Sequence, residues 1–143
     1  MGRLLSAALM AITLLAGCGR AEVEAQARRV AEAYFQAVKE KDVERALSFY
    51  AKRFFETRSP EGWKQDFGLI ADRLGALESF ALNSSRWSTD FVPPHSGSYV
   101  TLNYQVKYRS HGARETLTLH RPFTRGEFRI IGHEISSEGF LRE

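Results

Sequence analysis

The sequence predicts an α+β domain in which helices come first and a meander of antiparallel strands follows. Up to Gly75, apolar residues recur at steps of three and four, the spacing that gives an α-helix a single apolar stripe. Beyond Gly75 the period changes, and the clearest later segment alternates apolar and polar residues as a half-buried strand does. Amphipathic helices need a partner surface, and the strands supply one, so the two halves make a single α+β unit.

Three helices are expected in the first half of the domain. The first covers 23–38, and the second covers 43–54 with Asp42 as its N-cap. The third opens at Ser59-Pro60, where a capping residue is followed by proline at the first helical position. Tyr34 lies in the middle of the first stripe, so we expect its ring to be buried. The stripes consist of Val23, Ala27, Val30, Tyr34 and Val38; Val43, Ala46, Leu47, Tyr50 and Phe54; and Trp63, Phe67, Ile70 and Leu74.

Four segments are expected to form strands after the helices. They are 79–87, 98–109, 113–123 and 127–135, with a loop at Pro93-Pro94 between the first two. In the last segment, the adjacent residues Ile130-Ile131 indicate a bulge or a strand covered on both faces. The side chains expected to face inward are Val100, Leu102, Tyr104, Val106, Tyr108, Leu117, Leu119 and Phe123.

Residues 1–17 have the pattern of a targeting segment. Arg3 gives a short positive start, and the uncharged apolar run that follows is too short to span a bilayer as a mature helix. The run ends in Leu15-Ala16-Gly17-Cys18, which resembles the bacterial lipobox. The resemblance implies that Cys18 becomes the N-terminus of the mature chain and carries lipid, palmitate included, on its sulfur and amine. The alternative is an ordinary secretory signal that leaves Cys18 as a free thiol.

These boundaries divide the chain into four parts. Residues 1–17 form a signal peptide, 18–22 a short lipid-anchored tether, 23–135 a single domain, and 136–143 a C-terminal tail that we expect to fray. The sequence contains a single cysteine, Cys18, so it cannot form an intrachain disulfide. The short tether is expected to hold the domain against a membrane of the bacterial cell envelope.

The residue after the cysteine and the distribution of charge indicate the destination and the partners. Gly19 follows Cys18, and in enterobacterial lipoproteins a residue other than aspartate there usually directs the chain to the periplasmic face of the outer membrane. The net charge is +3, but basic residues alternate with acids, as in Lys39-Glu40-Lys41-Asp42, which is typical of a solvated helix face. The expected partners are therefore the membrane and an envelope protein or a small apolar ligand, and not nucleic acid.

The order of elements over Val23–Ile135 resembles the cone-shaped, cystatin-like fold of nuclear transport factor two, ketosteroid isomerase and SnoaL-type cyclases, in which a curved sheet wraps a long helix. A tighter resemblance is to a bacterial family of unknown function, numbered 4019. Phe128 stands where its pattern has tryptophan and His133 where it has tyrosine. The resemblance implies no activity, because the family has none assigned. The motifs that carry it are Trp63, Arg73-Leu74-Gly75, Gly97-Ser98-Tyr99, Glu115-Thr116 and Phe128-Arg129-Ile130 running into Gly132.

Glu115 is the most unusual polar position in the predicted sheet. It shares strand parity with Leu117 and Leu119, so it can face the interior, where a carboxylate could serve as a general base. Aspartates play this role in the isomerases of the cone fold. The simpler interpretation places Glu115 near a strand end, solvated or paired with an arginine such as Arg73.

The histidines offer a second candidate but no metal site. His133 lies beside Glu134 and could line the open mouth of the cone, whereas the simpler interpretation is a half-buried imidazole bonded to backbone. His95 and His111 fall in loops and are expected to be exposed, and His120 lies on the polar side of its strand. No pair has the spacing of a helical metal site, so we expect no metal and no cofactor.

Two classes of function follow. Tyr34, Tyr50, Trp63 and Tyr104 could line an apolar pocket, although core packing explains them more simply. We favour a lipid-anchored binding or interaction module of the envelope. The alternative is a small SnoaL-like or isomerase-like enzyme that uses Glu115 and His133. An open cavity with these two groups in hydrogen-bond reach would favour the enzyme, and a cone filled by aromatic side chains would favour the module.

Overall fold

The computed structural model describes residues 6–124 and 126–141, and within them the side chains from residue 19 onward. The helices come first: α1 spans Ser6–Lys39, α2 Val43–Leu47 and α3 Pro60–Leu74, with a 3-10 turn, η1, at Lys52–Glu56. The strands follow as β1 Leu77–Asp90, β2 Gly97–Tyr108, β3 Gly112–Pro122 and β4 Arg129–Ser136, and a second 3-10 turn, η2, spans Glu138–Phe140. Helices followed by an antiparallel sheet confirm the expected α+β class.

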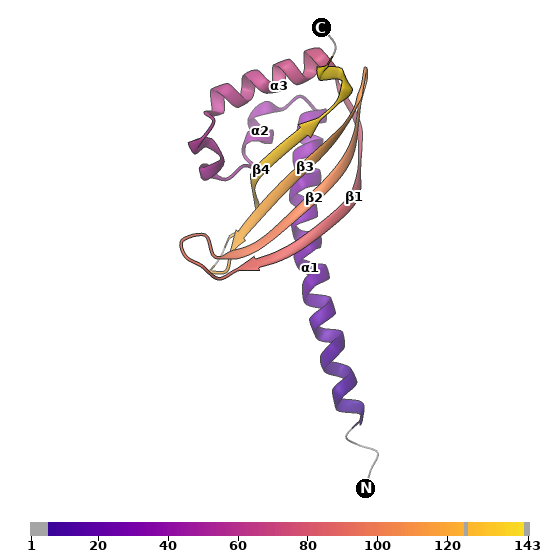
Figure 1. Cartoon of the computed structure of the whole chain (residues 1–143), viewed down its shortest axis with the longest axis vertical. Coiled ribbons are helices and arrows are strands. Elements are labelled where there is room, and N and C mark those ends of the chain that lie inside the picture. The colour runs from indigo at the N-terminus through magenta and orange to yellow at the C-terminus, as the bar shows by residue number, and fades with distance from the viewer. Residues whose placement is uncertain (1–5, 125, 142–143) are drawn as a thin grey trace.

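The four strands form one antiparallel sheet in the order β1-β2-β3-β4, so each strand pairs with its neighbour in the sequence. Figure 1 shows this sheet curving around the C-terminal half of α1, with α2 and α3 beside it. The core lies between the concave face and the helices. The alternation predicted for β2 and β3 is confirmed by the burial of Val100, Leu102, Tyr104, Val106, Tyr108, Leu117 and Leu119.

Small residues let α1 approach the sheet closely. Ala27 and Ala31 are fully buried, and their methyl groups leave room for larger rings nearby. Phe35 packs with its ring centroid 4.8 Å from that of Tyr104 on β2. Tyr34, in the middle of the stripe, is 2% exposed, which confirms its expected burial. The helix is therefore the element around which the sheet is wrapped.

The second helix ends sooner than its periodicity predicts. α2 stops at Leu47, so the expectation of a helix over 43–54 is wrong beyond that residue. The chain pairs with β4 instead: Ile130 N–H donates to the Phe49 carbonyl at 2.9 Å, and Ala51 N–H donates to the Ile130 carbonyl at 2.8 Å. β4 lies at the edge of the sheet, and its unpaired backbone groups take these partners in place of another helical turn.

The third helix begins and ends where the sequence predicts. The Ser59 hydroxyl accepts a hydrogen bond from Gly62 N–H at 3.0 Å, and Pro60 lies in the first turn. Gly75 follows the last turn with a φ of 86°, and a Cβ there would lie 2.9 Å from the Cβ of Arg109. Only glycine fits that conformation and that close approach.

The sheet differs from the prediction in the length of β1 and in the position of Phe123. β1 spans Leu77–Asp90, beyond the expected 79–87, because its pairing with β2 continues across two register shifts. The expectation that Phe123 faces inward is wrong. β3 ends at Pro122, so Phe123 leaves the sheet and is 49% exposed. Alternation fixes the facing of a side chain only while the strand lasts.

The bulge expected in the last strand is confirmed. Thr118 pairs with Gly132 and Leu119 pairs with Ile130, so Ile131 is the extra residue on β4. The bulge keeps Ile130 fully buried. The bulge also determines which face of the sheet the later side chains of β4 point to, including that of His133.

The two ends of the chain lie far apart in Figure 1. α1 begins upstream of Val23, where the first helix is expected to start, and the side chains of 1–17 and Cys18 lie outside the described residues. In the described part of the C-terminal segment, which we expected to fray, η2 places Gly139 against Leu74 and His111. No helix in the described part of the chain is long and apolar enough to cross a membrane.

Candidate functional site

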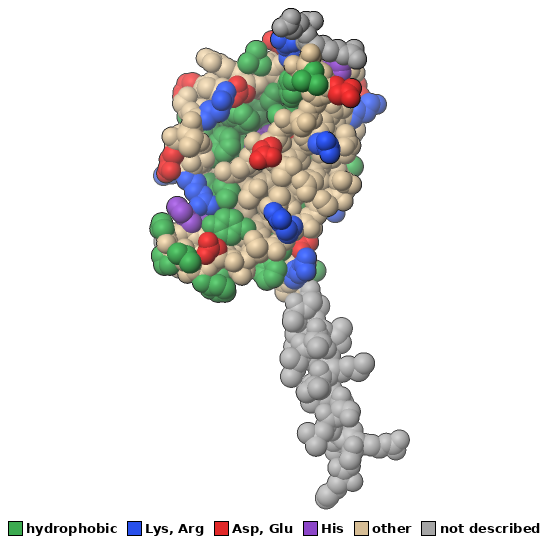
Figure 2. All heavy atoms as spheres, viewed as in Figure 1, with side chains coloured by type: hydrophobic (Ala, Val, Ile, Leu, Met, Phe, Trp, Pro, Cys, Tyr) green, Lys and Arg blue, Asp and Glu red, His purple; other side chains and the backbone are tan. Residues whose placement is uncertain are grey.

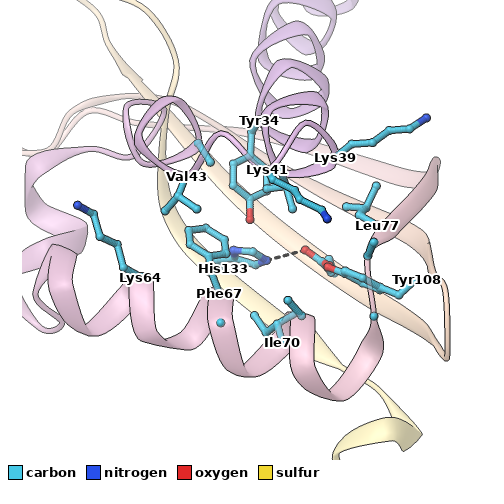
Figure 3. A pocket seen from close by; sticks show the side chains of 17 residues that line it. Tyr34, Lys39, Lys41, Val43, Lys64, Phe67, Ile70, Leu77, Tyr108 and His133 are labelled. Carbon is cyan, nitrogen blue, oxygen red and sulfur yellow. Dashed lines mark hydrogen bonds and ion pairs between the residues drawn. The ribbon is translucent and has the colours of Figure 1, made fainter.

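A cavity of about 380 Å³ lies between the end of α1, α2, α3 and the inward faces of β2, β3 and β4. Its wall is mainly apolar and includes Val38, Val43, Phe67, Ile70 and Leu77, several of which are visible in Figure 3. Three lysines also line it, Lys39, Lys41 and Lys64, and Figure 3 shows Lys39 and Lys64 pointing outward. Of the residues predicted to line a pocket, this cavity has only Tyr34 in its wall.

Three strands bring polar side chains to the floor of this cavity. Glu115 on β3 pairs with Ile135 in the register of the sheet, and His133 on β4 pairs with Leu117, so both side chains lie on the same face. Tyr108 comes from the end of β2. Figure 3 shows His133, Tyr108 and the Tyr34 hydroxyl pointing toward one another.

These groups form a continuous hydrogen-bonded chain. The Tyr50 hydroxyl lies 2.8 Å from His133 Nδ1, and His133 Nε2 lies 2.8 Å from Glu115 Oε2. The Tyr108 hydroxyl donates to the other carboxylate oxygen, Glu115 Oε1. One assignment of protons satisfies every group: Tyr50 donates to Nδ1, a neutral imidazole donates from Nε2, and an ionised Glu115 accepts.

Burial governs the electrostatics of the floor. The side chains of Glu115 and His133 are each 1% exposed, so water solvates neither of them appreciably. Burial raises the pKa of Tyr108, and the negative charge of Glu115 raises it further. Burial also raises the pKa of Tyr50 and, with the charges around it, that of Tyr34. The three phenols therefore stay protonated and remain hydrogen-bond donors at neutral pH.

Aromatic rings fix the imidazole of His133. The Tyr34 and Trp63 rings meet it edge-on, with centroids 5.7 Å and 5.5 Å away. The Tyr50 ring stacks on it at 6.3 Å. With both ring nitrogens bonded and three rings around it, the imidazole has one orientation. In this orientation, its Nε2 is directed at the carboxylate of Glu115.

The structure corrects both simpler interpretations of the predicted site residues. Glu115 is neither solvated nor placed against an arginine, because its side chain is 1% exposed and its carboxylate is hydrogen-bonded to His133 and Tyr108. His133 is not half-buried and bonded to backbone, because its side chain is buried and bonds to Glu115 and Tyr50. The two residues that the sequence singles out therefore meet at one place.

The predicted pocket aromatics divide into two groups. Tyr34 lines the cavity. Tyr50 and Trp63 are buried behind His133, with ring centroids 6.0 Å apart, and do not line it. Tyr104 packs against Phe35, away from the cavity. Tyr108 is the site residue that sequence reasoning missed, although its strand parity with Tyr104 already placed it on the inner face.

The other histidines lie outside the cavity. His95 is exposed, as expected. His111 is partly buried and lies against Gly139, which differs from the expected exposure. His120 bonds to the Ser96 carbonyl at 3.3 Å, and burial lowers the pKa of its imidazole. Within the described residues, no group of three or more His, Cys, Asp or Glu side chains is arranged to hold a metal ion.

The comparisons with known proteins concern the family alone. Searches among curated proteins and among solved structures found no match. A family model described as "Protein of unknown function (DUF4019)" matches residues 30–133, more than half of the chain. The matched region includes Tyr34, Tyr50, Tyr108, Glu115 and His133, so the whole hydrogen-bonded floor lies within it. The chain therefore belongs to the DUF4019 family, described as proteins of unknown function.

Proposed function

We propose that the protein is a lipid-anchored binding module of the bacterial cell envelope, and that its cavity takes a small, mainly apolar molecule. The observation that supports this best is the cavity of about 380 Å³ with apolar walls and a few polar groups converging on its floor. Small-molecule sites have this composition, in which apolar walls supply affinity and a few polar groups orient the ligand. A family of unknown function neither supports nor opposes the proposal.

The cavity holds Glu115 and His133 within hydrogen-bond reach, the arrangement expected of the enzyme, but the hydrogen bonds that engage His133 favour binding over catalysis. Both ring nitrogens of His133 are already engaged, so the imidazole cannot exchange a proton with a ligand unless it gives up Tyr50 or Glu115. Each oxygen of the Glu115 carboxylate accepts one bond and keeps a free lone pair. A ligand with an apolar body and one hydroxyl or amine donor matches this floor.

The lipid anchor and the envelope location are the other half of the proposal. Leu15-Ala16-Gly17-Cys18 behind an apolar run supports lipidation of Cys18, and Gly19 supports the outer membrane. The order of elements, with a curved sheet wrapped on a long helix, supports kinship with the nuclear-transport-factor-two-like cone. In the other form of this proposal, the module binds an envelope protein instead of a small ligand.

Binding is tested with aminoanthracene, a fluorescent apolar molecule with one amine donor. Ala71 lines the cavity on α3, and Ala71→Phe adds a ring at that wall. This variant is expected to weaken binding by about tenfold or more. Leu69→Phe is the matched control, since Leu69 lies on the same helix, is 60% exposed and does not line the cavity. Equal affinity in the parent and in Ala71→Phe, or no binding at all, would contradict the proposal.

A second candidate is an enzyme in which Glu115 abstracts a proton. The observation that favours it is the distance of 2.8 Å between His133 Nε2 and Glu115 Oε2 beside an open cavity. A desolvated carboxylate in an apolar pocket removes the ring proton of nitrobenzisoxazole as its N–O bond breaks, which gives a coloured phenolate. Turnover that exceeds that of free acetate and disappears in Glu115→Gln would favour this candidate. Absence of turnover in a protein that binds aminoanthracene would favour the binding module.

A further inference from the structure

One end of the molecule exposes three large apolar side chains. Phe91 is 77% exposed, Val92 69% and Phe123 49%. The rings of Phe91 and Phe123 stack with their centroids 5.2 Å apart, so the three residues form one surface, here called the apolar tip. Figure 2 shows hydrophobic side chains gathered at the end where Figure 1 places the loop between β1 and β2. A joined apolar surface of this kind is a candidate interaction site.

The loop that carries the tip has a restricted conformation. Pro93 and Pro94 follow Val92 directly, and each proline ring fixes one backbone dihedral. The Val92 N–H donates to the side chain of Asp90 at 2.8 Å. Figure 1 shows this loop protruding beyond the body of the domain. A protruding apolar tip of this kind can insert into a deformable surface. Because the loop is already restricted, it loses little conformational entropy on binding.

Contacts along α1 place the tip close to the start of the proposed mature chain. Arg121 donates a hydrogen bond to the side chain of Gln26 on α1. Phe123 follows Arg121 by two residues, which is about 7 Å along an extended chain. Cys18 precedes Gln26 by eight residues, which is about 12 Å of helix. The Ser85 hydroxyl also donates to Glu24 at 2.7 Å. The N-terminal part of α1 and the tip therefore belong to the same end of the molecule (Figure 1).

We propose that the apolar tip inserts into the interfacial layer of the bilayer that holds Cys18. This rests on the lipid anchor of the proposed function. Exposed aromatic and aliphatic side chains bind at the headgroup–acyl boundary, so the tip adds a second contact to the attachment that lipid on Cys18 would supply. A bilayer is favoured over a protein partner because the tip protrudes at the same end of the molecule as the residue proposed to carry the lipid.

Docking through the tip also orients the cavity. Lys39, which lines the cavity, follows Cys18 by 21 residues of the same helix, about 30 Å of axial length. With the tip in the bilayer, the cavity lies at the far end of the domain. Its ligand then arrives from the aqueous side and not directly from the membrane to which the protein is attached.

The experiment uses the full lipidated protein in vesicles of phosphatidylethanolamine and phosphatidylglycerol. Cys18 is the only native cysteine and its sulfur is blocked by lipid, so Val92→Cys adds the sole free thiol, which takes an environment-sensitive nitrobenzoxadiazole label. Lys107→Cys is the control, since its side chain is 71% exposed near the other end of β2. The label at 92 is expected to shift to the blue and to be quenched by lipids brominated in their acyl chains, whereas the label at 107 shows neither effect.

A second variant isolates the aromatic contribution. Phe91→Ser with Phe123→Ser in the Val92→Cys protein is expected to lower the quenching to that of the label at 107. Undiminished quenching in this variant overturns the proposed role of the rings. A blue shift at 92 without quenching by brominated lipid assigns the tip to a protein contact and overturns membrane docking. Equal signals from 92 and 107 overturn it as well.

The mass of the purified protein shows whether Cys18 carries lipid, so a failure of the docking can be distinguished from a failure of the lipid anchor. A protein that carries lipid on Cys18 and floats with vesicles, yet keeps the label at 92 in water, overturns the docking and leaves the anchor standing. A label found on Cys18 itself shows a free thiol, and then the anchor is wrong and the docking that rests on it falls too.

Discussion

The carboxylate of Glu115 lies where water cannot solvate it, and side chains do so instead. Tyr108 and His133 donate to its two oxygens, while Tyr50 holds the other nitrogen of His133. A buried charge costs several kcal/mol unless such donors replace water, and removing one partner leaves the other uncompensated. The residues joined by these hydrogen bonds therefore act as one unit, in which each side chain orients the next.

The first prediction concerns this unit. Glu115→Gln replaces one acceptor oxygen by an NH₂ group, so one of the two donors loses its acceptor, and the free energy of unfolding is expected to fall by about 1–3 kcal/mol. Glu134→Gln is the control, because Glu134 lies on the same strand as His133 but is exposed. Its effect should stay within about 0.5 kcal/mol. Chemical denaturation near neutral pH measures both. A Glu115→Gln protein as stable as its parent would show that Glu115 is not a structural anchor and would strengthen the enzyme candidate.

At the scale of elements, α1 supplies the surface around which the sheet is built, and the edge of the sheet decides where other elements stop. α2 ends where Phe49 and Ala51 pair with Ile130 on β4. η2 packs Gly139 against α3, where a Cβ would lie 2.5 Å from Leu74 Cδ2 and 2.7 Å from His111 Cδ2. The ends of these elements are therefore set by neighbours that are distant in the sequence.

The central position of α1 gives the second prediction. Tyr34 is 2% exposed and meets the rings of Phe35, Tyr50 and His133. Truncating a buried aromatic costs about 3–5 kcal/mol, a large share of the roughly 5–15 kcal/mol that stabilise a domain. Tyr34→Ala is therefore expected to lower the midpoint of thermal unfolding sharply. Phe91→Ala, at a ring that is 77% exposed, should change it little. Similar midpoints for the two variants would mean that α1 is not the centre of the core.

The third prediction compares two glycines. Gly139→Ala is expected to destabilise the protein, because its methyl group would overlap Leu74 and His111 and detach η2 from α3. Gly68→Ala on α3 has nothing within 4 Å of the new methyl group, and alanine favours a helix over glycine by about 0.5–1 kcal/mol, so stability should rise. Urea midpoints measure both. The two changes in stability should have opposite signs. A Gly139→Ala protein as stable as its parent would show that η2 is not docked on α3.

At the scale of the whole molecule, α1 joins the two places to which we assign different proposed roles. Its proposed lipid-bearing end lies at the same end of the molecule as the apolar tip, and its other end, at Lys39, lines the cavity. The sheet links the same two ends, since β2 and β3 run the length of the domain between them (Figure 1). The proposed membrane attachment and the proposed ligand site therefore lie at different ends of one small domain.

The fourth prediction tests the anchor. Cys18→Ala removes the sulfur of the lipobox-like motif Leu15-Ala16-Gly17-Cys18, so incorporation of a fatty-acid analogue should be lost. The protein should then either leave the membrane fraction or remain unprocessed. Ser6→Ala, within the apolar run, is the control and should leave the labelling intact. Unchanged labelling of the Cys18→Ala protein would exclude lipidation at this residue.

The sequence by itself determined the α+β class, the apolar stripe of α1 and the caps of α3. It also determined which side chains of β2 and β3 point inward, and it identified Glu115 and His133 as candidate site residues. These features depend on residues within a few positions of one another, because a helical turn, a cap and an alternating strand are local arrangements. Only the tertiary structure decided the early end of α2, the exposure of Phe123, and the meeting of Tyr50 with His133, residues 83 positions apart. Such contacts depend on sheet register and on which backbone groups remain unpaired at an edge. Neither is encoded in the period of any one segment.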